Sequence, residues 1–200
     1  MSNNMTYSEK LFTPVFRASF PHLFQPFVFP TGRNYSQEEK PKYSVTMCFD
    51  KENTGIQWFR DEVSKLVKEV WPEGWPEGGR SPVKDGDAEP SKIMPGCWLV
   101  DCHSYTRPGI IDRNKEAIID EERIYGGCFL RASITLAAYT GLGGGVTVFL
   151  NNCQFVKDGD RFGSKTNAAD DFDVITDETP ATSKPNIPAG DTYENSQLPF

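Results

Sequence analysis

Cationic and aromatic side chains are the residues of this chain whose types and spacing could do chemistry. Alternating strand-like runs carry Arg17, Lys42 and Arg131 on the sides opposite their apolar residues. Loop-like stretches place rings near further cations, and these residues are Trp71, Trp75, Tyr105 and Tyr125 with Arg80, Lys84, Arg107 and Arg113. Binding of single-stranded nucleic acid without sequence preference needs cations that follow phosphates and rings that stack on bases. The solvated face and rim of any β-domain has a similar composition, so that second interpretation stays open.

Motifs for catalysis or metal binding are weak by comparison. Cys97, Cys102 and His103 are close in sequence, but no second pair follows at the spacing of a zinc site. Neither histidine accompanies a nucleophile signature. We therefore predict no enzyme activity and no cofactor or metal. A magnesium-dependent nuclease remains the third-ranked alternative, with carboxylates drawn from Asp85, Asp87, Asp101 and Asp112.

The elements that would position the cations are mainly β. Five runs alternate polar and apolar residues with the period of two that marks half-buried strands, and they cover residues 14–20, 43–50, 96–105, 124–139 and 146–156. One helix is predicted over 54–70, where apolar residues recur every three or four positions. A five-stranded, partly open barrel of OB type satisfies this count, and a β-sandwich is the alternative.

The same patterns make predictions about individual aromatic residues. Residues 1–13 are polar and are expected to lack regular structure. Phe20 falls on the same side of its strand as Phe16 and Ala18, and should therefore point inward. Phe149 lies inside a strand and is predicted to be a core residue.

Charge divides the chain into two parts. Residues 1–165 carry 20 Lys and Arg against 21 Asp and Glu, whereas residues 166–200 carry one Lys against seven acids. We interpret 1–165 as the OB-fold domain and 166–200 as a disordered acidic tail that ends in the apolar Phe200. A polyanion tethered to a cationic surface can compete with DNA, and its terminal ring can dock on a partner protein.

Membrane association and export are not expected. The sequence lacks an apolar stretch long enough for a membrane-spanning helix, and its N-terminus has no apolar signal region. Five cysteines, an odd number, favour reduced thiols in a cytoplasm.

Several segments resemble a family of phage single-stranded-DNA-binding proteins with an OB fold, formerly catalogued as a phage domain of unknown function. The resemblance spans residues 15–163 and is most specific in IYGGCFLRASI and GGGVTVFLNNCQFVKDG, with KYSVTMCFDK, PVKDGD and RPGIID in the same order. The acidic tail that ends in phenylalanine is also similar to the tails of replicative phage single-strand binders.

This resemblance implies a protein of the host cell cytoplasm that coats and protects exposed strands during DNA replication, recombination and repair. Its partners would be single-stranded DNA, with duplex DNA as a further candidate, and phage replication proteins reached through the tail. The alternative is a phage structural or assembly protein whose β-domain binds other proteins. The sequence leaves the oligomeric state open.

Overall fold

The computed structural model describes residues 5–28, 40–52, 54–88, 94–141 and 143–163. Contacts between Cα atoms group Met1–Gly163 as one compact unit. The predicted acidic tail and Phe200 lie outside the described residues. The division of the chain at residue 165 and the disorder of the tail therefore stay predictions.

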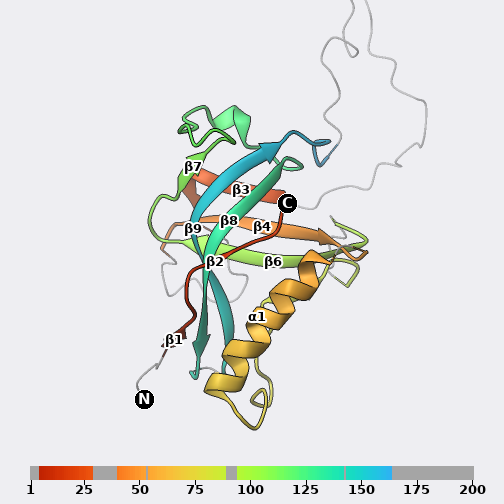
Figure 1. Cartoon of the computed structure of the whole chain (residues 1–200), viewed down its shortest axis with the longest axis vertical. Helices are drawn as coiled ribbons and strands as arrows, with labels where there is room; N and C mark the ends of the chain where they lie inside the picture. The colour runs from red at the N-terminus through yellow and green to blue at the C-terminus, as the bar shows by residue number, and fades with distance from the viewer. Residues whose placement is uncertain (1–4, 29–39, 53, 89–93, 142, 164–200) are drawn as a thin grey trace, which may run out of the picture. The chain divides into compact units, whose positions relative to one another are not determined.

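Five long strands overlap the five alternating runs of the sequence, and β3 continues beyond the end of its run at residue 20. They are β3 (Phe16–Phe27), β4 (Lys42–Asp50), β6 (Cys97–Ser104), β8 (Phe129–Tyr139) and β9 (Gly145–Lys157). β8 and β9 form the predicted hairpin, antiparallel from Phe129↔Lys157 to Tyr139↔Gly145. In Figure 1, β3, β4 and β6 run across the direction of this hairpin.

Pairing among these strands closes the sheet into a ring. β8 pairs with β3, β3 with β4, and β4 with β6, all antiparallel. β6 then pairs in parallel with β9, which returns to β8. Two joints are narrow, because β3–β8 has two register pairs and β6–β9 has the single pair His103↔Phe149. The fold is therefore the predicted OB-like barrel, mainly β with one principal helix and only partly closed.

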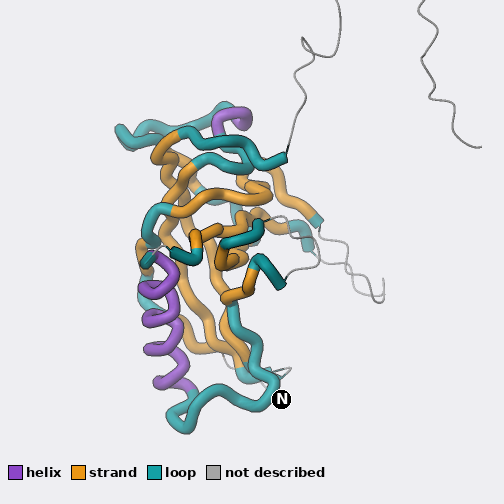
Figure 2. Tube along the Cα trace, turned by 90° about the vertical axis from the view of Figure 1, so that its right-hand side faces the viewer, coloured by secondary structure: helices purple, strands orange, loops and turns teal. Residues whose placement is uncertain are grey.

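The helix α1 (Gly55–Val70) follows β4, and Thr54 is its N-cap. Its buried side chains Ile56, Phe59 and Val63 belong to the same core cluster as the inner residues of β4 and β8. Pro72 follows the last turn, and proline lacks the amide that would continue the helix. Figures 1 and 2 show α1 alongside one part of the sheet. No helix in the described part of the chain is long and apolar enough to cross a membrane.

Short strands complete the sheet at positions that the sequence did not predict. They are β1 (Met5–Tyr7), β2 (Leu11–Phe12), β5 (Val83–Asp85) and β7 (Gly109–Ile111). β1 and β2 both pair with β8, so the expectation that residues 1–13 lack regular structure is wrong for these two segments. Unpaired amides and carbonyls at the edge of a long strand can order such short segments, which carry too few residues for a visible periodicity.

The central hairpin begins later than its apolar run suggests. A 3₁₀ turn, η1 (Glu121–Arg123), and the Gly126-Gly127 pair precede β8. Gly127 has φ 112° and its Cα packs against the Asp160 carbonyl, where a Cβ would not fit. This close approach ties the start of β8 to the turn that follows β9.

Candidate nucleic-acid interface

The outer surface of β4 and β6 carries the polar side chains of the two strands. These strands pair continuously from Tyr43↔Ser104 to Asp50↔Cys97. Their inner residues, such as Val45 and Val100, are buried in the core, so strand alternation turns Ser44, Thr46, Asp101 and His103 outward. We call this surface the β4–β6 face. In OB folds the corresponding face, on the second and third barrel strands, binds oligonucleotides and oligosaccharides.

A hollow of about 230 Å³ lies on the β4–β6 face. We call it the Ser44 pocket, and its lining residues are Phe20, Lys42, Ser44, Val45, Thr46, Asp101, Cys102 and His103. Three strands contribute to it, since Phe20 comes from β3. The pocket therefore exists only where β3, β4 and β6 lie side by side.

The hydroxyl of Ser44 has a special place in this pocket. Its Oγ is buried and has no hydrogen-bond partner among the described residues. A buried hydroxyl left in this condition costs about 1–3 kcal/mol. The neighbouring hydroxyl of Thr46, by contrast, donates to Asp101 Oδ1 at 2.6 Å, and Lys84 Nζ donates to Asp101 Oδ2 at 2.9 Å. A ligand with a donor or acceptor would remove the cost once a neighbouring side chain shifts to let it reach the Oγ, which has almost no surface of its own open to solvent.

Phe20 presents its ring to solvent at the rim of the pocket. The residue is 53% exposed, so the prediction that it points inward with Phe16 and Ala18 is wrong. Its φ of 45° is rare for a residue other than glycine, and the register between β3 and β4 shifts between Ser19 and His22. A bulge of this kind reverses the alternation of the strand and re-aims the side chain.

Four further rings form a row across neighbouring strands. Phe149 of β9 lies 6.2 Å from Tyr7 and 5.0 Å from His103, measured between ring centroids. His103 in turn meets the edge of Tyr105 at 5.7 Å. Tyr7 and Tyr105, at the two ends of the row, are more than half exposed. Phe149 is half-buried on the outer surface, so its prediction as a core residue is wrong.

Burial sets the protonation of the two histidines beside Ser44. His22 and His103 face Ser44 from the strands on either side. Burial lowers the pKa of His103 below its usual 6.5, and Lys42 lowers it further, while Asp101 opposes both. Burial also lowers the pKa of His22. Both imidazoles are therefore neutral at pH 7, suited to stacking and hydrogen bonding and not to pairing with phosphate.

The structure brings two of the residues predicted from sequence to the β4–β6 face. Lys42 lines the Ser44 pocket and Tyr105 ends the row of rings. Lys84, on the adjoining strand β5, is engaged with Asp101. Together they supply cation and ring at one surface.

Other predicted contact residues have structural partners. Arg17 donates to the Asp160 carbonyl at 2.8 Å and lies over the Phe162 ring. The Tyr125 hydroxyl bonds Asp158 and the Gly159 carbonyl, each at 3.1 Å. Both side chains therefore hold the turn after β9. Their predicted contact with DNA is untested.

The remaining predicted residues are spread over several loops and the strand β8. Trp71 stacks on Trp75 at the end of α1, with centroids 6.0 Å apart. Arg80 pairs through its backbone with Gly145, and Arg107 lies over the Phe24 ring. Arg113 is exposed. Arg131 lies on the outer surface of β8, where its Nε donates to Gln154.

Sequence reasoning placed Ser44 on the polar side of its strand but did not select it as a contact residue, and it missed Tyr7, Phe20, His103 and Phe149 as surface rings. Alternation alone marks His103 as sharing a side with Asp101, so that signal was present. Phe20 points outward because of a bulge in β3, and no pattern in the sequence predicted this bulge.

The carboxylates considered for magnesium are engaged locally. Asp85 and Asp87 both pair with Lys51, and Asp112 Oδ1 accepts from the amides of Asn114 and Glu116. Within the described ranges, no three His, Cys, Asp or Glu side chains gather as a metal site would require.

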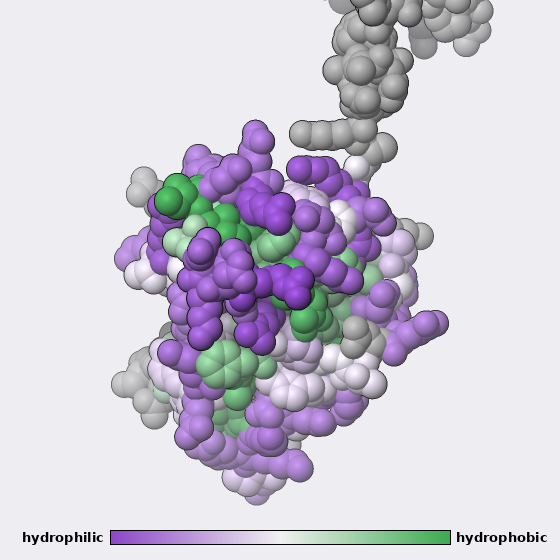
Figure 3. All heavy atoms as spheres, turned by 45° about the horizontal axis from the view of Figure 1, so that its top comes forward, coloured by the Kyte–Doolittle hydropathy of each residue, from purple (hydrophilic) through white to green (hydrophobic). Residues whose placement is uncertain are grey.

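Apolar side chains reach the surface in separate patches. Figure 3 shows them among hydrophilic side chains on the face turned to the viewer. Large exposed apolar residues are frequent in the N-terminal strands; they include Tyr7, Phe12, Phe20 and Phe27. These strands were not expected to carry the exposed rings.

Comparison with known proteins agrees with this architecture. A single-stranded DNA-binding protein from bacteriophage Enc34 shares 26% identity with a TM-score of 0.59, and covers 82% of this chain and 90% of its own. A second structure of that protein, in complex with ssDNA, gives 27% identity and a TM-score of 0.60 over 77% of this chain and 89% of its own. The gp2.5 single-stranded DNA binding protein of bacteriophage T7 shares the fold, with 16% identity and a TM-score of 0.57 over 84% of this chain and 99% of its own.

Sequence relatives extend the same picture. Protein p50 of Acyrthosiphon pisum secondary endosymbiont phage 1 is 27% identical over 175 residues, which is 80% of this chain and 90% of p50. The sequence model described as "Enterobacter phage Enc34, ssDNA-binding protein" matches residues 9–182. The chain therefore belongs to the Enc34 ssDNA-binding protein family.

Proposed function

We propose that this phage protein binds single-stranded DNA on the β4–β6 face, and coats and protects exposed strands during replication, recombination and repair. The observation that carries the proposal is the Ser44 pocket, where the exposed ring of Phe20 and the half-buried ring of His103 lie near a buried hydroxyl that has no partner among the described residues. A relative with 27% identity has been solved in complex with ssDNA, which supports the same ligand. We infer that the protein acts by binding and not by catalysis, in the host cell cytoplasm.

Each group on the β4–β6 face has a distinct role in this proposal. The rings of Phe20 and Tyr105 stack on bases, because every base has a face that an aromatic ring can cover. Lys42 neutralises a phosphate. Ser44 hydrogen-bonds a base edge or a sugar oxygen. The loop residues Trp71, Trp75, Arg80, Arg107 and Arg113 would extend the contact, as the sequence predicts.

The tail completes the proposed function. Residues 166–200 carry a net charge of −6, and we propose that they compete with DNA for the cationic surface and recruit replication proteins through Phe200.

Fluorescence anisotropy of labelled oligo-dT, at two salt concentrations and with unlabelled duplex as competitor, tests DNA binding directly. We expect wild-type binding that weakens with salt and survives the competitor. Phe20→Ala and Tyr105→Ala should each weaken binding roughly tenfold, the loss of one stacked base. Lys42→Gln should lower the slope of affinity against salt by about one phosphate contact.

Ile119→Ala is the matched control, since Ile119 is an exposed apolar residue that does not line the Ser44 pocket. Its affinity should equal that of the wild type. If the three β4–β6 variants bind as tightly as this control, the DNA path lies elsewhere on the molecule. If the wild-type protein binds no oligo-dT at either salt concentration, the proposed function is wrong.

A further inference from the structure

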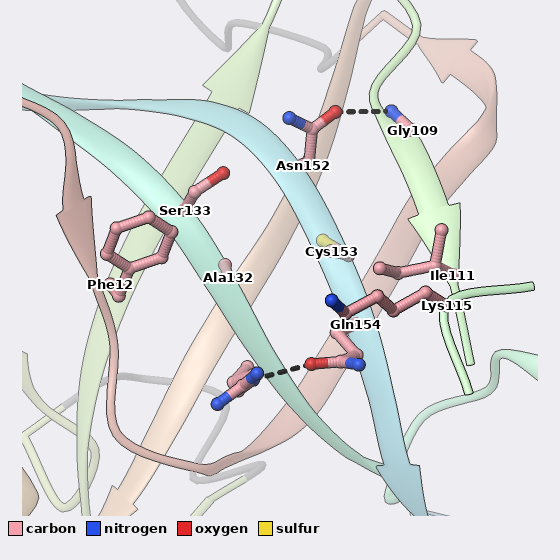
Figure 4. Close-up of a pocket in the computed structure, with 10 residues that line it drawn as sticks. Phe12, Gly109, Ile111, Lys115, Ala132, Ser133, Asn152, Cys153 and Gln154 are labelled. Carbon is pink, nitrogen blue, oxygen red and sulfur yellow. Dashed lines mark hydrogen bonds between the residues drawn. The ribbon is translucent and has the colours of Figure 1, made fainter. Parts of the chain in front are cut away.

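The outer surface of the β8–β9 hairpin carries a second hollow, of about 310 Å³. We call it the Phe12 pocket. Figure 4 shows its floor on the hairpin, with Ala132 and Ser133 of β8 beside Cys153 of β9. The Phe12 ring stands at one side of this floor, and Ile111 and Lys115 stand at the other. None of its lining residues belongs to the Ser44 pocket, so the two hollows are separate sites.

Phe12 is the most exposed ring named at either pocket. It is 72% exposed on β2, although a large apolar side chain gains free energy by burial. Its backbone is held at the edge of β8 by pairing with Ser133, and its ring is open to solvent. An open ring at the side of a hollow is a platform on which a flat ligand can stack.

Polar groups at the edge of the Phe12 pocket are held in position by hydrogen bonds. The Gln154 amide accepts from Arg131 Nε at 2.6 Å and donates to the Asp112 carbonyl at 2.8 Å. This bridge orients the exposed guanidinium of Arg131 and leaves its terminal N–H groups for a ligand. Asn152 Oδ1 accepts from the Gly109 amide at 2.9 Å, so its Nδ2 is directed away from Gly109, as Figure 4 shows.

Lys115 reaches the pocket from a strained turn. Its φ of 69° lies in the left-handed region, which an L side chain rarely adopts. The turn persists because Asp112 accepts backbone amides from Asn114 and Glu116, and the Asp112 amide donates to the Glu116 carbonyl. Strain that the surroundings maintain is concentrated at functional sites. Here it places a second cation at the side of the pocket opposite Phe12.

We propose that the Phe12 pocket is a second subsite for the same DNA strand, in which one unstacked base lies on Phe12 and the flanking phosphates meet Arg131 and Lys115. This inference rests on the proposed function. Charge complementarity selects the occupant, because two cations flank an apolar slot that also offers an amide donor. An apolar side chain of a protein would leave these three groups without partners.

The strand β9 connects the two subsites. Phe149, in the row of rings, and Asn152, in the Phe12 pocket, are three residues apart on β9. A strand rises about 3.3 Å per residue, so they lie roughly 10 Å apart along it. A single DNA strand that leaves the β4–β6 face along β9 therefore reaches Phe12 within a few nucleotides.

Oligonucleotide length separates the two subsites experimentally. Full-length Phe12→Ala and Lys115→Gln proteins would be titrated with labelled oligo-dT of about 4 and about 16 nucleotides, the range of site sizes for one OB fold. We expect Phe12→Ala to weaken binding of the longer oligonucleotide roughly tenfold and to leave the shorter one unchanged. Lys115→Gln should reduce the salt dependence for the longer oligonucleotide alone.

A photochemical experiment gives a second readout. Wild-type protein bound to oligo-dT with one 5-iodouracil would be irradiated and digested. The peptide that contains Phe12 should be cross-linked, and only when the 5-iodouracil stands at one particular position of the oligonucleotide. For the titrations, Ile119→Ala is the matched control for Phe12→Ala, and Lys65→Gln is the matched control for Lys115→Gln. Ile119 is an exposed apolar residue and Lys65 an exposed lysine, and neither lines the pocket.

Three results would overturn this subsite. If Phe12→Ala and Ile119→Ala bind the longer oligonucleotide with equal affinity and the Phe12 peptide is not cross-linked, no base binds in the Phe12 pocket. An affinity that rises in Phe12→Ala would mean that the pocket holds another part of the protein. Loss of binding to both lengths would show that Phe12 belongs to the first subsite. Failure of the proposed function is distinguishable, because the wild-type protein would then bind neither oligonucleotide.

Discussion

The guanidinium of Arg17 lies between the Asp160 carbonyl and the Phe162 ring, far along the chain from both. Strand alternation in the sequence correctly predicts that Arg17 points away from the core. Its charge led to the prediction of a phosphate contact. The contacts of Arg17 instead join β3 to the turn after β9. A cation on an outer face can therefore stabilise the fold through contacts within the chain.

We expect Arg17→Gln to lower the free energy of unfolding by about 1–2 kcal/mol, because it removes a charge-assisted hydrogen bond and a cation–π contact. DNA affinity should stay within about twofold, since those partners are internal. Urea unfolding and oligo-dT anisotropy measure the two effects. Arg113→Gln, at an exposed loop position, is the control for stability. If Arg17→Gln has normal stability but binds DNA more weakly, Arg17 contacts a phosphate, as the sequence predicts.

At the scale of elements, β6 places His103 between β4 and β9. The pKa of its imidazole is lowered by burial and by Lys42, with Asp101 as a smaller opposing influence. The folded state therefore binds fewer protons than the unfolded chain near the usual pKa of 6.5. The stability that depends on neutral His103 is present above pH 6.5 and is lost as the pH falls below it.

His103→Gln should therefore flatten the decline in stability between about pH 7.5 and pH 5.5. The urea midpoint of wild-type and variant proteins, compared at both pH values, measures this change. Burial also lowers the pKa of His22, so His22→Gln tests whether the neighbouring imidazole contributes in the same direction. Parallel pH dependences of wild type and His103→Gln would show that its titration does not affect folding.

Long elements were predictable and short ones were not. The helix and the five long strands carry enough residues for a period of 3.6 or 2 to be visible. β1, β2, β5 and β7 have two or three residues each, and they are ordered by the edges of the long strands. Phe12 and Tyr7 therefore escaped prediction, although both contribute to proposed binding surfaces.

At the scale of the whole molecule, charge is divided between a nearly neutral body and the acidic residues 166–200. Deleting residues 166–200 removes a net charge of −6 and should raise affinity for single-stranded DNA, most visibly at low salt. Anisotropy of the full-length and shortened proteins at two salt concentrations checks this. A full-length variant with the seven tail acids replaced by Asn and Gln separates charge from length. Unchanged or weaker binding in both variants would exclude competition by the tail.

The sequence by itself determined the helix, the five long strands and the concentration of negative charge near the C-terminus, which follow from local periodicity and composition. Periodicity left an OB-type barrel and a β-sandwich as alternatives, and the resemblance to a phage family favoured the barrel. Tertiary structure decided which outer residues meet, as it did for Ser44 and Phe20 in one pocket and for Phe12 and Lys115 in another. Alternation assigns a side chain to one of two faces, but it identifies neither the neighbouring strand nor the partner across it. Arg17 and Arg131 are equivalent in sequence, because each is a cation on the polar side of a strand. In the structure Arg17 bonds the distant turn after β9, whereas Arg131 stays exposed.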